Sequence, residues 1–183
     1  MIKASNRILD VIKELEGCSL TVYKDTAGLD TIGIGHLITK DSKITVPLPN
    51  EQAALDLLAK DITTIERSMN RIVGNIGLPQ NQADALLSFS FNVGTEAFSE
   101  STLLKKLRKN DVEGASDEFL RWVLSGPAGA KKVTEGLVKR RVVEQGIFIS
   151  SSAKAAEHAG KLSSKSLKES ITIIEGYLYG QAR

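Results

Sequence analysis

The sequence predicts an α+β protein that is predominantly helical and contains one small strand-rich lobe. Three patterns support this class. Apolar residues recur at helical spacing along most of the chain, β-branched residues alternate with glycine only within residues 20–46, and one helical pattern covers residues 50–73. The 183 residues are 42% hydrophobic, and Cys18 is the only cysteine, so we expect a packed core without disulfides.

Charge and hydropathy exclude several functional classes. The net charge of +2 is too small for bulk electrostatic binding of nucleic acid. No run of about 18 apolar residues is present, and the first residues lack the apolar core of a signal peptide. We therefore expect synthesis and folding in the cytosol. A lone cysteine has no thiolate partner for a structural zinc site.

The first helix is predicted to begin after Ser5, whose side chain can cap it, and to end at Gly17. Its apolar residues occur at i, i+3, i+4 and i+7, which places them on one face. They are Ile8, Val11, Ile12 and Leu15.

Three short strands are predicted next, in the runs LTVY, TIGIG and ITV of a small antiparallel sheet. After Pro47 and Pro49, Asn50 can cap the long helix, which we expect to join two lobes. Further helices are predicted at residues 80–92, 101–109, 111–124 and 134–149, and together they form a second, all-helical lobe.

The segment 150–183 differs in composition from the rest of the chain. It begins rich in serine and alanine and ends in one amphipathic helix, whose apolar face is Leu167, Ile171, Ile174 and Leu178. The simplest expectation is that this helix docks on the helical lobe or self-associates. A membrane-active helix is the alternative.

Two carboxylates and a hydroxyl are predicted to converge, because Glu16 closes the first helix, Asp25 lies in the turn after the first strand, and Thr31 opens TIGIGH. Glycoside hydrolysis needs one carboxylic acid and one carboxylate. Glu16, above a buried helix face, is the better candidate for the acid. Gly33 and Gly35 remove side chains from one strand face, where a flat sugar ring would fit. Spacing alone does not separate this pair from surface carboxylates.

The run ELEGCSLTVYKDTAGLDTIGIGHLIT resembles the catalytic segment of the phage-type lysozymes, the endolysin muramidases of glycoside hydrolase family twenty-four. The family pattern is Glu-Gly, then Tyr-x-Asp, then Gly-x-x-Thr-x-Gly-x-Gly-His, and every position is filled here. The runs LPQNQADALLSFSFNVGTEAFSESTLLKKL and GLVKRRVVEQGIF are similar to the helical lobe of the family. The likeness covers residues 5–149.

The resemblance implies an endolysin that cuts the β-1,4 bond between N-acetylmuramic acid and N-acetylglucosamine in peptidoglycan, for host cell lysis. Glu16 would be the general acid, Asp25 would position the water, and the Thr31 hydroxyl would lie near that water. No metal or cofactor is implied, and a monomer is expected. The protein would remain in the host cytoplasm until a holin lesion releases it to the cell wall.

The resemblance also implies a domain organisation. Residues 1–149 would form the lysozyme-like catalytic domain, and residues 150–183 a C-terminal extension. Within the catalytic domain we expect a β-containing lobe at 16–50, a connecting helix at 50–73, and a helical lobe at 74–149 packed with the first helix.

Seven further residues are candidates for the surroundings of the site. The expected saccharide contacts are Gly33, Gly35, Asn92 and Arg141. The expected structural residues near the site are His36, Asp61 and Arg140. His36 and Asp61 are expected to form an ion pair, and one of the two arginines is expected to approach Glu16.

Residues 131–141 are basic and have two open interpretations. They hold the polymer through its peptide carboxylates, or they are a solvated helix face. The charged residues are Lys131, Lys132, Lys139, Arg140 and Arg141 against Glu135.

Other functions also stay open at this point. The main alternative to the enzyme is a catalytically silent domain that binds glycan. Transglycosylase chemistry, which yields an anhydro product, is a nearby alternative to hydrolysis. Killing of cells helped by a membrane-active C-terminal helix is the third alternative.

Overall fold

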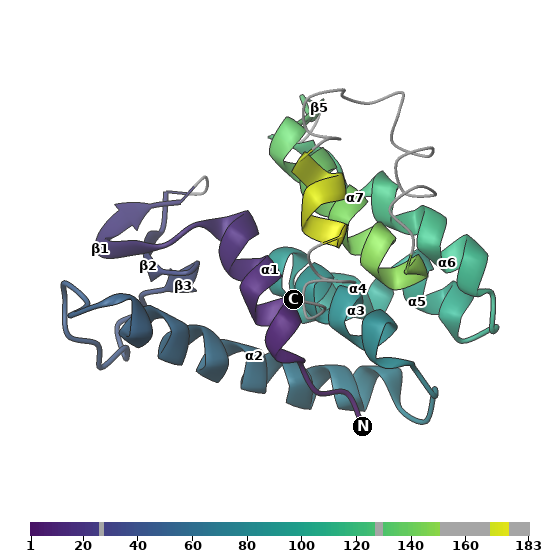
Figure 1. Ribbon diagram of the computed structural model, residues 1–183, viewed down its shortest axis with the longest axis horizontal. Helices are drawn as coiled ribbons and strands as arrows, with labels where there is room; N and C mark the ends of the chain where they lie inside the picture. Colours follow the sequence, from purple (N-terminus) through teal and green to yellow (C-terminus); the bar gives the residue numbers. More distant parts are fainter. Residues whose placement is uncertain (26–27, 127–129, 151–168, 176–183) are drawn as a thin grey trace.

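A long helix, α2 (Glu51–Val73), joins a small β-containing lobe to a larger helical lobe in the computed structural model (Figure 1). The structure describes residues 1–25, 28–126, 130–150 and 169–175. The predominance of helices with small antiparallel sheets confirms the predicted α+β class. Across these ranges, no helix combines the length and apolarity needed to cross a membrane.

Helix α1 (Asn6–Glu16) begins and ends where the sequence predicts. The Ser5 hydroxyl accepts a hydrogen bond from the Ile8 N–H at 3.3 Å and so caps the helix. Ser5 Oγ also donates to Asp84 Oδ2 at 2.5 Å, which ties the start of α1 to the helical lobe. Gly17 takes φ +74°, a conformation that favours glycine, and Glu16 becomes the last helical residue.

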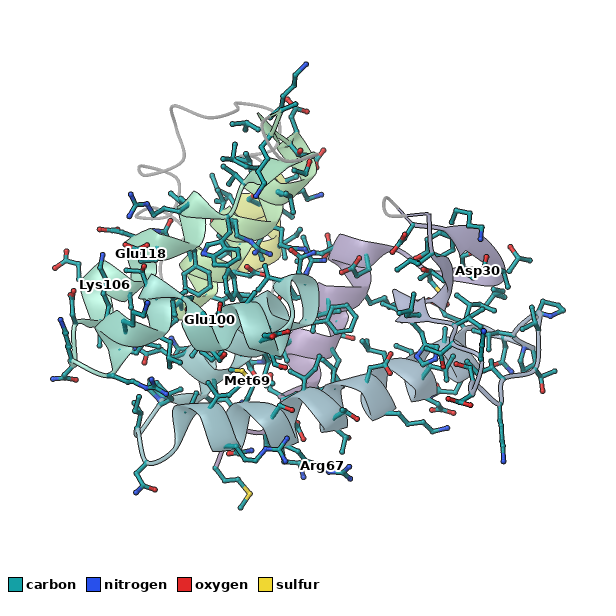
Figure 2. The ribbon with its side chains drawn as sticks, turned by 180° about the vertical axis from the view of Figure 1, so that it is seen from behind. Asp30, Arg67, Met69, Glu100, Lys106 and Glu118 are labelled. Carbon is teal, nitrogen blue, oxygen red and sulfur yellow. The ribbon has the colours of Figure 1, made fainter. Side chains whose placement is uncertain are left out.

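The β-containing lobe holds one antiparallel sheet in the order β1 (Ser19–Lys24), β2 (Asp30–Gly33) and β3 (His36–Leu37). The strand predicted for the run TIGIG therefore ends at Gly33, and the last two residues of the run lie in the turn between β2 and β3. Gly33 and Gly35 make this turn at φ +68° and +72°. In Figure 2, Asp30 marks this lobe at the end of the molecule away from the helical lobe.

The prediction of a strand at residues 44–46 is wrong. Leu48 N donates to Leu20 O at 2.8 Å, so this segment does touch the sheet at β1. Pro47 and Pro49 have no N–H to donate, and the contact cannot extend into a ladder.

The long helix α2 confirms the predicted connection. The Asn50 side chain accepts a hydrogen bond from the Ala53 N–H at 3.0 Å, and the helix ends before Gly74. The side chain of Met69 extends from α2 to the next helix, where its sulfur accepts a hydrogen bond from Ser90 Oγ at 3.0 Å (Figure 2). The buried face of α2 consists of Ala54, Leu58, Ile62, Met69 and Val73.

The helical lobe is built around α3 (Gln80–Val93) and α7 (Glu135–Ile149), which pack along each other. Phe89 of α3 is central, since edge-to-face contacts join its ring to those of Phe98, Phe119 and Trp122 at 5.2–6.3 Å. The surrounding elements are α4 (Thr95–Glu100), α5 (Thr102–Leu107) and α6 (Val112–Glu118).

Three features of this lobe differ from the prediction. The helix expected at 111–124 stops at Glu118 and continues only as a 3₁₀ turn, η1 (Phe119–Arg121). A hairpin of β4 (Leu124–Ser125) and β5 (Lys132–Val133) follows, and α4 is also an addition to the predicted helices. Lys106 and Glu118 are joined by an ion pair of 2.6 Å in the helical lobe, far from Asp30 (Figure 2).

The described part of the C-terminal extension, residues 169–175, is helical and lies beside α7 (yellow in Figure 1). Ser170 Oγ donates to Lys139 O at 3.3 Å, and Lys139 forms an ion pair with Glu169 at 2.8 Å. Ile173 and Ile174 are buried in the core. This agrees with docking on the helical lobe, while the predicted positions Leu167 and Leu178 lie outside the described residues.

Candidate active site

Glu16 lies at the C-terminal end of α1, where the two lobes meet (Figure 1). Its side chain is 24% exposed, and Arg140 Nη2 of α7 lies 2.5 Å from its Oε1. The Arg140 side chain is only 5% exposed, so water screens this ion pair weakly. Of the two arginines expected near Glu16, Arg140 makes the contact.

Asp25 and Thr31 are brought together by the backbone of Leu29. The Leu29 N–H donates to Asp25 Oδ1 at 2.8 Å, and Thr31 Oγ1 donates to the Leu29 carbonyl at 3.2 Å. Asp25 is half-buried in the turn after β1, and Thr31 is buried in β2. The turn and the strand therefore hold the carboxylate and the hydroxyl on one short segment.

Tyr23 links Glu16 to this segment and is a site residue that sequence reasoning missed. It lies opposite Thr31 in the register of β1 and β2. Partial burial raises the pKa of the Tyr23 phenol, and the negative charges of Glu16 and then Asp25 raise it further. Both carboxylates therefore act on one side chain. The Tyr-x-Asp spacing was the available signal.

Gly33 and Gly35 face different neighbours. A Cβ at Gly35 would lie 3.7 Å from Glu16 Cδ and 3.4 Å from Phe91 Cζ, so this turn residue borders the candidate acid. A Cβ at Gly33 would instead lie 3.4 Å from Ala54 Cβ, on the side of α2. The expectation that both glycines open one strand face is wrong, because the chain turns between them.

His36 and Asp61 form the expected pair. His36 Nδ1 lies 2.8 Å from Asp61 Oδ2, and the contact joins β3 to α2. Both side chains are partly buried. The pair holds the sheet on the connecting helix, which agrees with a structural role near the site.

Arg141 does not face the position expected of a saccharide contact. Its side chain is completely buried, and burial lowers its pKa to about 10. Its Nη2 donates to Asn92 Oδ1 at 2.8 Å, and Asn92 is the exposed residue of the pair. Arg141 is adjacent to Arg140 on a helix, so the two side chains point about 100° apart, and only one can reach Glu16.

A buried carboxylate, Glu144, lies behind these arginines and was also missed. Glu144 Oε2 lies 2.9 Å from Arg141 Nε, and its Oε1 accepts a hydrogen bond from Ser88 Oγ at 2.8 Å. The i+3 spacing from Arg141 and the i+4 spacing from Arg140 were the signals in the sequence.

The basic residues of 131–141 divide between surface and interior. Lys131 and Lys132 are exposed beside β5, whereas Lys139 is paired with Glu169 and Arg140 with Glu16. The exposed lysines are thus the ones placed to meet an anionic polymer.

The arrangement suits acid–base cleavage of a glycosidic bond, which requires a proton donor and a separate carboxylate. Glu16 supplies one group from the helical side, and Asp25 with Thr31 supplies the other from the sheet. In the part of the chain that the structure describes, no group of three or more His, Cys, Asp or Glu side chains is arranged to hold a metal ion.

Comparison with known proteins identifies relatives of this chain. An endolysin of Acyrthosiphon pisum secondary endosymbiont phage 1 is 40% identical over 144 residues, which are 79% of this chain and 96% of the relative. The endolysin of Salmonella phage P22 is 33% identical over 152 residues, or 82% of this chain and 100% of the relative. The solved muramidase domain of SpmX from Asticaccaulis excentricus has a TM-score of 0.73 and 30% identity and covers 81% of this chain and 99% of that domain.

The family model for phage lysozyme matches residues 13–144, a range that contains Glu16, Asp25, Thr31 and both site arginines. This match covers well over half of the chain and agrees with the relatives at 33–40% identity. The chain therefore belongs to the phage lysozyme family, and the predicted enzyme, an endolysin that hydrolyses peptidoglycan as a muramidase, is confirmed.

Proposed function

We propose that Glu16 is the general acid of this endolysin and protonates the oxygen of the β-1,4 bond between N-acetylmuramic acid and N-acetylglucosamine. The proposal depends on one observation: Glu16, held by Arg140 of the helical lobe, borders the sheet at Gly35, and Asp25 lies in the turn after β1 of that sheet. A glycosidic bond bound between them would have a proton donor on one side and a carboxylate on the other.

Asp25 positions the water in this proposal, and the Thr31 hydroxyl lies beside it. The Leu29 N–H donates to Asp25 Oδ1 at 2.8 Å and so fixes the orientation of this carboxylate in the turn after β1. Asp25 also has a further interaction within the protein. The buried position of Thr31 limits the orientations that its hydroxyl can take.

Substrate contacts are proposed at Gly35 and Asn92. Gly35 borders Glu16 without a side chain, and Asn92 is exposed at the end of α3. Arg141 acts on the substrate only through Asn92, because its guanidinium is buried. Gly33 has a packing role against α2.

Residues 1–149 are proposed as the catalytic domain and residues 150–183 as an extension of it. The protein is proposed to act as a monomer and to reach the wall through a holin lesion. The buried side chains of Ile173 and Ile174 support docking of the extension rather than membrane insertion.

The fragments that the protein releases from purified sacculi test which glycosidic bond is cut and whether the reaction is hydrolysis. Mass spectrometry after borohydride reduction is expected to find muropeptides that end in reduced N-acetylmuramic acid. An anhydro end, which borohydride leaves unchanged, would identify a transglycosylase. A reduced N-acetylglucosamine end would place the cut at the other glycosidic bond. Either result would contradict the proposal.

Assays on intact and on permeabilised Gram-negative cells test both the route to the cell wall and the role of residues 150–183. The full-length protein is expected to clear permeabilised cells and to leave intact cells alive, both when added outside and when expressed without a holin. Ile174→Asp, which disrupts the apolar face of residues 169–175, serves as the matched variant. Killing of intact cells by the full-length protein, lost in Ile174→Asp, would support the membrane-active alternative instead.

A further inference from the structure

Glu144 is a completely buried carboxylate with no part in the chemistry proposed above. Its Oε1 lies 3.8 Å from Arg140 Nη1, and its Oε2 lies 2.9 Å from Arg141 Nε. Arg140 in turn holds Glu16 at 2.5 Å. The Arg140 guanidinium thus lies between two carboxylates, one at the site and one in the core.

The sequence of α7 creates this arrangement. Residues 140, 141 and 144 are spaced i+3 and i+4, so the carboxylate lies one helical turn beyond the arginines. Helix α3 closes the other side with the Ser88 hydroxyl on Glu144 and the Phe89 ring 4.8 Å from the Arg141 guanidinium. Packing of α3 on α7 therefore fixes the positions of all these charges.

The contact between Arg140 and Glu16 opposes the role of Glu16 as a general acid. A nearby guanidinium stabilises the ionised carboxylate, whereas an acid must hold its proton until it reaches the glycosidic oxygen. The weak screening at this buried arginine makes the conflict stronger. A second negative charge on the far side of Arg140 reduces the net positive charge that Glu16 experiences.

We propose that Glu144 is a positioning residue whose buried charge offsets Arg140 and so preserves proton donation by Glu16. The proposal rests on the proposed role of Glu16 as the general acid. Behind Glu16, the charges of Arg140, Arg141 and Glu144 sum to +1, and removal of the Glu144 charge raises this sum to +2.

The electrostatics of the cluster support coupling between the two carboxylates. Burial raises the pKa of Glu144, and the charges of Arg141 and Arg140 and the hydrogen bond from Ser88 oppose this rise; the charge of Glu16 adds to it by a smaller amount.

Other charged groups on the packed elements have their own neighbours. On β1, the Tyr23 phenol also faces Glu16. On α3, Asp84 is bonded to Ser5 and Gln80, and on α6, Glu118 is paired with Lys106. In the described ranges, the charges that act on Glu144 are those of Arg141, Arg140 and Glu16.

The pH dependence of sacculus hydrolysis by Glu144→Gln tests the proposal. The alkaline limb, where the acid loses its proton, is expected to move to lower pH by about one unit, while the acid limb stays in place. At a pH on that limb the rate falls about tenfold. A profile that is only scaled down at every pH would overturn the proposal, because a purely structural defect has that effect.

Two further measurements keep the test decisive if Glu144→Gln folds poorly. The double variant Arg141→Met with Glu144→Gln restores the charge balance, and its alkaline limb is expected to return toward the wild-type position. In wild-type protein with carboxyl ¹³C labels, the Glu144 resonance is expected to shift at the midpoint of the alkaline limb. The proposal is contradicted if the alkaline limb of the pH profile stays displaced in the double variant, or if the chemical shift of the Glu144 carboxyl carbon does not change with pH.

Glu16→Gln separates failure of this inference from failure of the proposed function. If Glu16→Gln is inactive while Glu144→Gln keeps the wild-type pH profile, Glu16 is the acid and Glu144 has no influence on it. If Glu16→Gln remains active, the proposed function itself is wrong.

Discussion

Glu16→Gln is expected to reduce the rate of lysis of permeabilised Gram-negative cells by about a hundredfold to ten-thousandfold, the usual contribution of a general acid. The amide keeps the size of the side chain and still accepts a hydrogen bond from Arg140, but it cannot donate a proton to the leaving oxygen. The measurement is the initial loss of turbidity at matched protein concentration.

Glu14→Gln is the matched control for this variant. Glu14 lies on the same helix, two residues earlier, and its side chain is exposed. It should lyse cells at the wild-type rate, with both variants unfolding near the wild-type temperature. Wild-type lysis by Glu16→Gln would refute the acid role. A wild-type protein that binds sacculi and releases no fragments would support the glycan-binding alternative.

Arg141→Met is expected to lower the free energy of unfolding by about 3–5 kcal/mol, the cost of leaving one partner of a buried ion pair alone. Arg141 is completely buried, and its loss leaves Glu144 with less compensation in the core. The Asn92 carbonyl and the Phe89 ring lose their contacts as well. Urea unfolding followed by circular dichroism measures the change.

Arg121→Met is the control, because Arg121 pairs with Glu118 at 3.4 Å while its side chain is 73% exposed. Glu118 is buried but keeps its shorter ion pair with Lys106, so we expect loss of the exposed Arg121 charge to cost up to about 1 kcal/mol. The double variant Arg141→Met with Glu144→Gln removes both buried charges and is expected to regain much of the lost stability. Equal effects of Arg141→Met and Arg121→Met would show that burial does not strengthen the inner pair.

The site residues that lie close together in the sequence were predictable, because local structure places them. A helix stop at Gly17, a turn at Asp25 and a strand at Thr31 follow from residue type and spacing over about two dozen positions. The choice between Arg140 and Arg141 did not follow. Adjacent helical residues differ in direction by about 100°, and only the packing of α7 against α1 and α3 decides which one reaches Glu16.

The buried position of Glu144 was even harder to predict from the sequence. In the sequence it is one of 22 acidic residues, and nothing local distinguishes it from a solvated side chain. Its burial depends on α3, more than fifty positions earlier, whose Ser88 supplies a hydrogen bond. The hairpin of β4 and β5 was missed for a related reason, because strands of two residues are too short for an alternating pattern.

The hydrogen bonds between Ser5 and Asp84 have a mechanical consequence. They fasten α1 to α3, so Glu16 is held with the helical lobe, whereas Asp25 and Thr31 belong to the sheet. The proposed proton donor and the proposed water-positioning groups therefore stand on parts of the molecule that α2 joins. Because α2 carries none of these groups, we expect a substitution that bends this helix to change the distance between them, and with it the rate of hydrolysis.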